Sequence, residues 1–253
     1  LTLNSVNIDT KDFTWQTSLN YSFNKNEIDK LYNDLERVGN YFVGQSINVI
    51  YTKRFGGIWQ SDEAEIAKIY NAEPGDYKII DRNRNNIIDD DDRDFVGQTT
   101  PQFFGSFSNT FKSHGFDLTI FLTYAGGHKI YNPFAYLDSY SPSANMSPDY
   151  YHNYWTPERP SNKYPRLGST NSQLYETDGM YQKGDYIRLK NLELGYTLPR
   201  NIANKVYASN IRVYASVQNL VTFTKYTGFD VETSNANPYP ACRVFMGGLT
   251  VNF

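Results

Sequence analysis

Residues 13–23 read FTWQTSLNYSF, and this stretch indicates the class of fold. Its odd positions carry Phe, Trp, Thr, Leu, Tyr and Phe, whereas its even positions carry Thr, Gln, Ser, Asn and Ser. Because successive side chains of a β-strand point to opposite faces, the segment has one apolar and one polar face. Residues 211–223 (IRVYASVQNLVTF) repeat the pattern, with a single polar lapse at Asn219 on the apolar face. The alternation predicts two amphipathic strands that are longer than most strands of soluble domains.

Other segments are typical of strands or helices. Further strands are expected over about 46–58, 102–112, 116–124, 186–197 and 242–253, and helical spacing occurs only over 27–37 and 61–70. The tight turn Lys112–Gly115 predicts a hairpin between two of these strands. Within 186–197 the apolar residues lie at odd positions up to Leu189 and at even positions from Leu192. This change of phase predicts a β-bulge near Lys190–Asn191.

The composition of the 253 residues excludes several classes of protein. A hydrophobic fraction of 40% excludes disorder and collagen. A mean hydropathy of −0.60 with no long apolar run excludes helical membrane proteins. A β-barrel membrane protein is not excluded, because its strands are apolar only at every second position. The net charge of −3 argues against a nucleic-acid partner, and the single Cys242 rules out a disulfide within the chain.

The connections between the predicted strands alternate between long and short. From the C-terminus backwards they are 224–241 (long), 198–209 (shorter), 127–184 (very long), 112–115 (tight) and 59–101 (long). An antiparallel outer-membrane barrel shows this alternation, with short periplasmic turns and long external loops. The connection 25–45 should be short under this scheme and is not, so either helix 27–37 forms an enlarged periplasmic turn or the scheme fails at this point.

Seven predicted strands cannot close a membrane barrel alone. An open sheet in lipid leaves two rows of unpaired backbone groups, so the chain must pair with strands that it lacks. A soluble β-sandwich or lipocalin-like fold also alternates and is the competing interpretation. Strands of this length and loops of more than 40 residues disfavour it.

An acidic stretch at 81–93 follows the spacing of a calcium-binding loop. Its oxygen donors fall at loop positions one, three, five, seven, nine and twelve; they are Asp81, Asn83, Asn85, the carbonyl of Ile87, Asp89 and Asp92. Asn86 stands where glycine usually makes the sharp turn, although asparagine tolerates the left-handed conformation. The residues predict a Ca²⁺ or Mg²⁺ site; the alternative is a solvated loop whose Asp and Asn side chains cap turns.

Signatures of enzymes are absent from the sequence. His114, His128 and His152 fall on predicted turns or external loops, where an outer-membrane hydrolase could use the last two, but surface histidines are usually bystanders. The segment 131–166 is rich in aromatic residues, namely Tyr131, Phe134, Tyr136, Tyr140, Tyr150, Tyr151, Tyr154, Trp155 and Tyr164. These rings form either a binding surface or a small core within a long loop. No substrate-binding residue can be named from them.

Several motifs together resemble one family over nearly the whole chain. They are 12–15 (DFTW), 22–26 (SFNKN), 44–47 (GQSI), 57–60 (GIWQ), 74–76 (PGD), 109–111 (NTF), 115–118 (GFDL), 154–158 (YWTPE), 185–191 (DYIRLKN), 195–199 (GYTLP), 218–220 (QNL) and 225–230 (KYTGFD). The chain resembles the C-terminal part of a SusC/RagA-type TonB-dependent outer-membrane transporter of Bacteroidota. The terminal Phe253 resembles the aromatic end of the final barrel strand in that family.

The resemblance implies an all-β, antiparallel transmembrane barrel of 22 strands, of which this chain would supply the last seven or eight. It also implies a plug, energy from the TonB system, a SusD-like surface lipoprotein, and import of glycans or peptides across the bacterial outer membrane. No plug or TonB box is present in residues 1–253, so the remaining barrel and plug would be partners of this segment, as would outer-membrane lipid. The implied activity is transport without catalysis. A soluble or surface carbohydrate-binding β-module is the alternative function.

Overall fold

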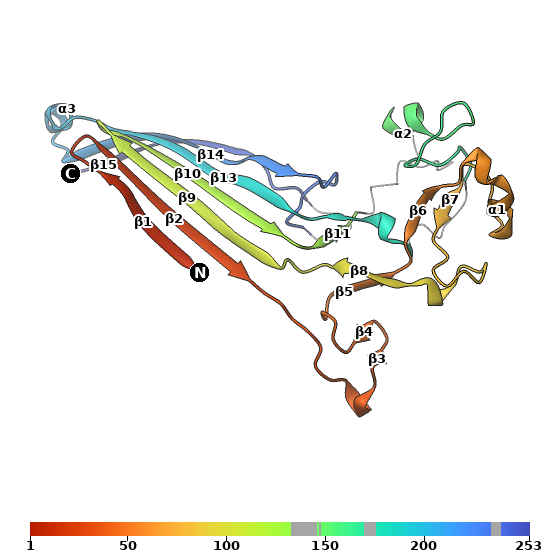
Figure 1. Cartoon of the computed structure of the whole chain (residues 1–253). Coiled ribbons are helices and arrows are strands. Elements are labelled where there is room, and N and C mark those ends of the chain that lie inside the picture. Colours follow the sequence, from red (N-terminus) through yellow and green to blue (C-terminus); the bar gives the residue numbers. More distant parts are fainter. Residues whose placement is uncertain (133–145, 147, 170–175, 234–238) are drawn as a thin grey trace.

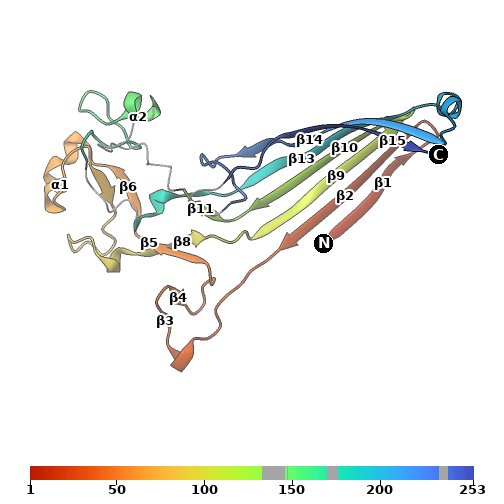
Figure 2. The same cartoon turned by 180° about the vertical axis from the view of Figure 1, so that it is seen from behind.

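The computed structural model describes residues 1–132, 146, 148–169, 176–233 and 239–253. A long antiparallel sheet of seven strands forms one end of the molecule, and a loop assembly forms the other (Figures 1 and 2). The order in the sheet is β1 (Thr2–Asp9), β2 (Phe13–Phe23), β9 (Phe103–Ser113), β10 (Phe116–Gly126), β13 (Tyr186–Thr197), β14 (Asn210–Thr224) and β15 (Val244–Asn252). We use "loop assembly" for the described parts of 24–102, 127–185 and 225–243. No helix among the described residues is long and apolar enough to cross a membrane.

The pairing register places most of the apolar side chains of the long strands on one face, although Phe104 and Phe121 lie on the other. Residues paired across an antiparallel ladder point to the same side. One such row runs Trp15, Phe111, Leu118, Leu194 and Ala215, and another runs Leu19, Phe107, Leu122, Leu189 and Val221. This apolar face lies open, with 64% of Phe23, 52% of Leu194 and 63% of Phe223 exposed. The apolar sides of 13–23 and 211–223 therefore belong to one exposed face and do not meet in a sealed core.

Most of the strand predictions are confirmed, together with the bulge. β2 has the predicted bounds, and β9, β10, β13, β14 and β15 lie within two residues of theirs. Lys190 has no partner in the pairing with β10 or β14, so it is the extra residue that changes the phase of β13. The polar lapse Asn219 takes a left-handed φ of 53° and donates from Nδ2 to the carbonyl oxygen of Cys242 at 3.0 Å.

Two predictions about strands and helices are wrong. The segment 46–58 lies outside the sheet: it forms β5 (Val49–Thr52), paired with β8 (Asp94–Gln98), and β6 (Phe55–Ile58), paired with β7 (Tyr77–Ile79). The expected helix 27–37 does not form: the segment has a 3-10 turn at Tyr32–Asp34 and then enters a hairpin of β3 (Arg37–Val38) and β4 (Tyr41–Phe42). The expected helix 61–70 is present as a 3-10 turn, Ser61–Glu63, followed by α1 (Ala64–Ile69).

These corrections remove the difficulty in the alternation of connections. β2 and β9 are joined by one long excursion over 24–102, which begins well before the predicted 59, so no enlarged turn at the other end is needed. All three long connections leave the sheet at the same end, which also carries β11 (Lys129–Tyr131), β12 (Tyr181–Lys183) and α2 (Pro148–Asn153) (Figure 1). The short connections lie at the opposite end, one of them with α3 (Arg200–Ala203) and a 3-10 turn at Asn204–Val206. Further 3-10 turns lie at Asp90–Asp92 and Asp178–Met180.

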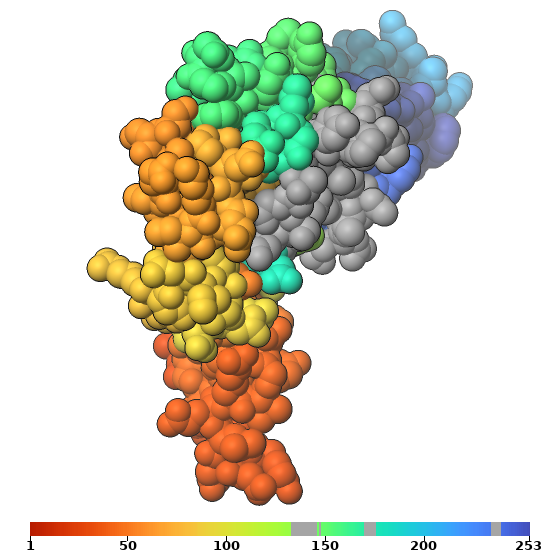
Figure 3. All heavy atoms as spheres, turned by 90° about the vertical axis from the view of Figure 1, so that its right-hand side faces the viewer, coloured from red at the N-terminus to blue at the C-terminus, as the bar shows by residue number. Residues whose placement is uncertain are grey.

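The buried apolar clusters lie in the loop assembly. One contains Ile58, Tyr77, Trp155 and Met180, a second Trp59, Ala67 and Ala72, and a third Ile130, Tyr226 and Val231. Figure 3 looks onto this end of the molecule, where the segment with β3 and β4 projects away from the rest. The loops thus carry their own small cores, while the sheet needs burial from outside.

Candidate functional site in the loop assembly and on the polar face

The acidic loop lies between β7 and β8 and folds around its own carboxylates. Asp81 accepts hydrogen bonds from the N–H groups of Arg84 (2.6 Å) and Asn86 (2.8 Å) and from the hydroxyl of Tyr70 (3.0 Å). Partial burial raises the pKa of Asp81, but the hydrogen bonds from Asn86 and Tyr70 outweigh it and leave the pKa below its usual value. Asn86 has the left-handed φ of 65° that its position in a calcium-type loop requires. Asp81 is therefore held ionised at the start of the loop.

The last donor position of the loop is buried. Asp92 is 1% exposed and accepts from the N–H groups of Arg82 (2.7 Å) and Asp89 (3.0 Å). Asn83 and Asn85 each accept from the N–H two residues further on, at 3.0 and 2.8 Å. Within the described ranges, no group of three or more His, Cys, Asp or Glu could hold a metal, so any site depends on amide and carbonyl oxygens as well. The ion itself stays a prediction.

The aromatic residues of 131–166 that the structure describes are mainly packing residues. Tyr150, Trp155 and Tyr164 are buried, while Tyr151 is exposed; Phe134, Tyr136 and Tyr140 lie outside the described residues. Trp155 Nε1 donates to Gln60 Oε1 at 3.0 Å, which ties this loop to the one that carries α1. The rings therefore build a small core between two loops.

Gly75 in the PGD motif is fixed by the same core. Its φ is +91°, and a Cβ there would lie 2.5 Å from Trp155 and 2.7 Å from Arg166. Arg166 Nε in turn donates to Asp76 Oδ1 at 3.0 Å. Close packing against Trp155 and Arg166 therefore explains the glycine of the PGD motif.

The three histidines lie apart from any catalytic arrangement in the part of the chain that the structure describes. His114 lies in the β9–β10 turn, where its Nδ1 is 2.8 Å from Ser113 Oγ. His152 in α2 contacts the ring of Tyr151. Burial lowers the pKa of His128, and the charge of Asp185 opposes this shift only in part, so its imidazole is neutral at neutral pH. No hydrogen bond joins His128 or His152 to a carboxylate among these residues.

A buried ion network lies on the polar face at the loop end. Arg188 of β13, 4% exposed, donates to Asp230 Oδ1 and to Glu232 Oε2, both at 2.6 Å. Lys190 Nζ lies 3.1 Å from the same Glu232 oxygen. Asp230 also accepts from the N–H of Ala241 at 2.9 Å. The charges of two cations and two carboxylates thus cancel, and the network fastens the connection between β14 and β15 to the sheet.

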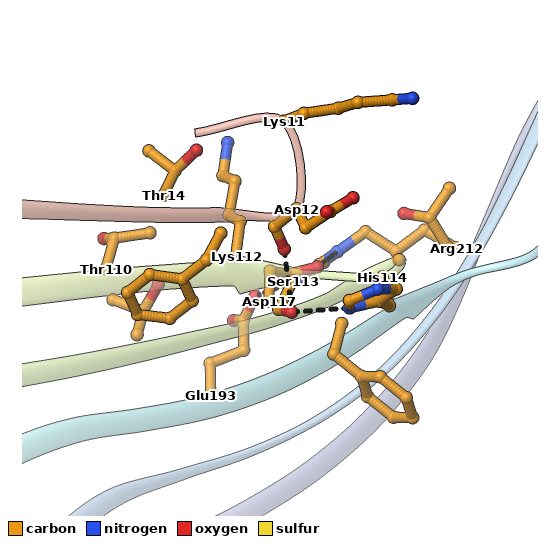
Figure 4. Close-up of a pocket in the computed structure, with 15 residues that line it drawn as sticks. Lys11, Asp12, Thr14, Thr110, Lys112, Ser113, His114, Asp117, Glu193 and Arg212 are labelled. Carbon is orange, nitrogen blue, oxygen red and sulfur yellow. Dashed lines mark hydrogen bonds and ion pairs between the residues drawn. The ribbon is translucent and has the colours of Figure 1, made fainter. Parts of the chain in front are cut away.

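A second ion network lies on the polar face at the short-turn end (Figure 4). Arg212 of β14 donates to Asp117 of β10 at 2.5 and 3.0 Å and to Glu193 of β13 at 2.7 Å. Gly195 makes room for it, because a Cβ there would lie 2.3 Å from the guanidinium. A cavity of about 640 Å³ opens beside the network and is also lined by Lys112. The sequence shows these charges on polar strand faces, but only the register brings them together.

Comparisons with known proteins agree with this architecture. No protein-family model matches the chain. The TonB-dependent receptor P3 of Formosa agariphila is 31% identical over 282 residues, which cover 99% of this chain and 28% of that receptor. The TonB-dependent receptor SusC of Bacteroides thetaiotaomicron is 28% identical, with 99% of this chain and 26% of SusC covered. The chain thus spans little more than a quarter of the length of the curated relatives that it matches.

Solved structures give the fold. The RagAB peptide transporter superposes with a TM-score of 0.81 at 24% identity over 100% of this chain and 28% of that one. The 'open-open' state of the RagAB peptide importer gives 0.79 over the same shares. At this identity the likeness speaks for the fold alone, and it confirms the predicted antiparallel barrel wall. In sequence and in fold, the chain is similar to the C-terminal part of SusC/RagA-type TonB-dependent receptors, which are β-barrels of the bacterial outer membrane.

Proposed function

We propose that this chain forms part of the wall of a TonB-dependent importer that passes glycans or peptides across the outer membrane. The apolar face of the sheet contacts lipid, and the polar face lines the interior. The loop assembly faces the outside, shapes the mouth and contacts a SusD-like lipoprotein. The plug, which couples the barrel to TonB, contacts the polar face near the cavity beside Arg212. The mechanism is gated passage without catalysis.

One observation carries this proposal. A single sheet has an exposed apolar face along its whole length, an ion-rich polar face, and all of its long connections at one end. Lipid removes the cost of exposing the apolar face, while water or a plug is needed beside the charges of the other face. A soluble module would bury that apolar face within its own fold.

Accessibility in cells tests the orientation. Cys242 is exposed and lies where β15 begins, at the loop end. In cells that carry the full-length receptor, we expect a membrane-impermeant maleimide to label Cys242 without permeabilisation. The matched variant Cys242→Ser with Lys205→Cys places the thiol in a short connection and should be labelled only after permeabilisation. Labelling of both in intact cells, or of neither, would contradict the orientation.

Loss of uptake tests the activity. Deleting the receptor gene should abolish growth on one polymer, and deleting the TonB gene should do the same. Degradative genes beside the receptor gene indicate which polymers to try first. Unchanged growth on every glycan and protein source that the cells use would contradict the import function.

We also propose that the acidic loop binds Ca²⁺ through Asp81, Asn83, Asn85, the Ile87 carbonyl, Asp89 and Asp92. The left-handed Asn86 and the N–H groups that already orient the carboxylates support this, since hard oxygens at this spacing suit the ion. Chelation, or Asp81→Ala with Asp92→Ala, should increase protease cleavage within 81–93. Equal cleavage with and without chelator would contradict ion binding and favour the alternative, a solvated loop.

A further inference from the structure

The long excursion between β2 and β9 begins with a small unit that contains β3 and β4 and stands apart from the buried clusters (Figure 3). We refer to residues 26–47 as the hairpin unit. Its two ends are tied together, because Asn26 Oδ1 accepts hydrogen bonds from Ser46 Oγ and from the N–H of Ile47, both at 2.9 Å. The hairpin unit is therefore a closed structure and not an extended linker.

One face of the hairpin packs against the rest of the loop assembly. The ring of Phe42 contacts Tyr51 of β5 and Phe95 of β8, with centroids 4.6 and 4.9 Å apart. Arg37 pairs with Phe42 across the hairpin, and its guanidinium lies 4.9 Å from the centroid of that ring and 5.0 Å from that of Tyr51. These aromatic and cation–π contacts fix the orientation of the hairpin relative to β5 and β8.

The opposite face of the hairpin is apolar and open. Val38 and Tyr41 are paired across the hairpin, and because successive residues of a strand point to opposite sides, both lie on the side away from Phe42. Val43 follows two residues after Tyr41, and all three side chains are between 42% and 48% exposed. An apolar face on a fixed support marks a surface that another part of a protein covers.

The charges near this face do not favour a strongly charged partner. The stretch 25–37 contains three cations and four carboxylates, which gives a net charge of −1. Four of these groups form ion pairs within the stretch, Lys25 with Glu27 at 3.1 Å and Lys30 with Asp34 at 2.6 Å. An apolar partner segment therefore suits the open face better than an ionic one.

The position of Leu1 indicates which segment lies nearest to this face. β1 runs antiparallel to β2, and Leu1 exchanges two backbone hydrogen bonds with Tyr21, at 2.8 and 2.9 Å. Leu1 therefore lies at the loop end of the sheet, close to the point where the chain leaves β2 for the hairpin unit. The hairpin unit also lies beyond β2 on the side of the β1 edge (Figures 1 and 2). In the proposed full-length barrel, the residues that precede Leu1 enter at the same place.

We propose that the open face formed by Val38, Tyr41 and Val43 packs against the outward connection that precedes Leu1 in the full-length receptor. The inference rests on the proposed barrel wall and adds a contact partner for one part of the loop assembly. Because its other face is fixed to β5 and β8, the hairpin unit acts as a brace between that connection and this loop assembly. The surface lipoprotein and a second copy of the receptor are competing occupants, which the test separates.

Photo-cross-linking in intact cells identifies the occupant. The photoreactive residue p-benzoylphenylalanine replaces Tyr41 in the full-length receptor, and the cross-linked peptides are identified by mass spectrometry. The matched control carries it in place of Tyr151, which is exposed on α2 in the same loop assembly. We expect the Tyr41 position to join to residues before Leu1, in a product that migrates as a single receptor chain, with at least fivefold higher yield than the Tyr151 position. Cross-links chiefly to the lipoprotein or to a second receptor chain, or no cross-link, overturn the proposal.

A charge on the open face tests the packing in a second way. Tyr41→Asp should increase hydrogen exchange in the segment before Leu1 by about threefold or more in the receptor in detergent, because the contact that protects it is lost. Tyr151→Asp should leave that exchange unchanged. Equal exchange in the two variants overturns the brace. Growth that depends on the receptor gene is measured in the same cells: if it persists without the cross-link, the packing alone fails, and if it does not depend on that gene, the import function fails while the cross-link still supports the packing.

Discussion

Arg188 is the most deeply buried cation of the sheet, and its buried charge is tolerated because two carboxylates compensate it. Removing one partner of a buried ion pair leaves the other charge uncompensated, which typically costs about 3–5 kcal/mol. Asp230→Ala should therefore loosen residues 226–233 by about 3 kcal/mol, measured by hydrogen exchange on the receptor in detergent. Lys190→Gln removes only a half-exposed link and should change the same amides by less than about 1 kcal/mol. Equal effects of the two variants would show that the network does not fasten this connection.

The same carboxylate predicts a dependence on pH. Burial raises the pKa of Asp230, but hydrogen bonds from the Glu232 and Ala241 N–H groups and from Arg188 outweigh it and place the pKa below the usual 3.8. A lowered folded-state pKa contributes stability that is present above 3.8 and is lost as the pH falls through the lowered value. Exchange of 226–233, corrected for its intrinsic pH dependence, should be constant from pH 7 to pH 5 and should rise below 3.8. Asp230→Asn should remove that rise.

At the residue scale, the sequence predicts chemistry only where the partners are close along the chain. The acidic loop is local, so its spacing and the left-handed Asn86 could be predicted. Arg188 and Glu232 are separated by 44 residues, and nothing before the strand register is known brings them together.

At the scale of elements, period-two alternation predicts those strands in which it runs unbroken. The alternation did not predict β1, because its short apolar series is interrupted by a shift of register between Val6 and Ile8. The helix expected over 27–37 had apolar spacing, but Tyr32 and Leu35 are exposed, and the backbone N–H and C=O of Ile28 bond to Gln45 and Gly44 instead of to helical partners. The strands at 46–58 do form, but they pair within the loop assembly, which alternation cannot reveal.

The bulge in β13 gives a prediction about this element. Lys190 is the extra residue that keeps Ile187 and Leu189 on the same face as Leu192 and Leu194. Deleting Lys190 would turn one half of the strand over, placing either Glu193 or Arg188 toward lipid, where a charged side chain is unfavourable. We expect the deletion to reduce the assembled receptor in outer-membrane fractions at least fivefold, measured by heat-modifiable migration on gels.

A substitution at Lys190 supplies the control for the deletion. Lys190→Gln keeps the number of residues, and therefore the phase of the strand, and should assemble at the wild-type level. Normal assembly of the deletion variant would mean that the register of β13 can slip without penalty.

At the scale of the whole molecule, the two faces of the sheet should differ sharply in their tolerance of charge. Leu192 and Val217 are paired near the middle of the apolar face. Leu192→Arg should destabilise the receptor folded into lipid vesicles by about 2–4 kcal/mol, measured by urea titration. Ser108→Arg, near the middle of β9 on the polar face, should cost less than about 1 kcal/mol. Equal costs would contradict the assignment of the faces.

The edges of the sheet give the last prediction. β1 and β15 each pair on one side only, so both edges present unpaired backbone groups, and the apolar face is open as well. In lipid each unpaired group costs several kcal/mol, and the two edges together cost on the order of tens. In water the exposed apolar face and free edges favour association.

Residues 1–253 expressed alone should therefore yield aggregates or detergent-dependent oligomers, measured by light scattering and by sedimentation in plain buffer. Co-expression with the rest of the barrel should recover assembly, because the missing strands pair with both edges. A monomer in plain buffer with a single cooperative melting transition would contradict the barrel wall and favour a soluble carbohydrate-binding module.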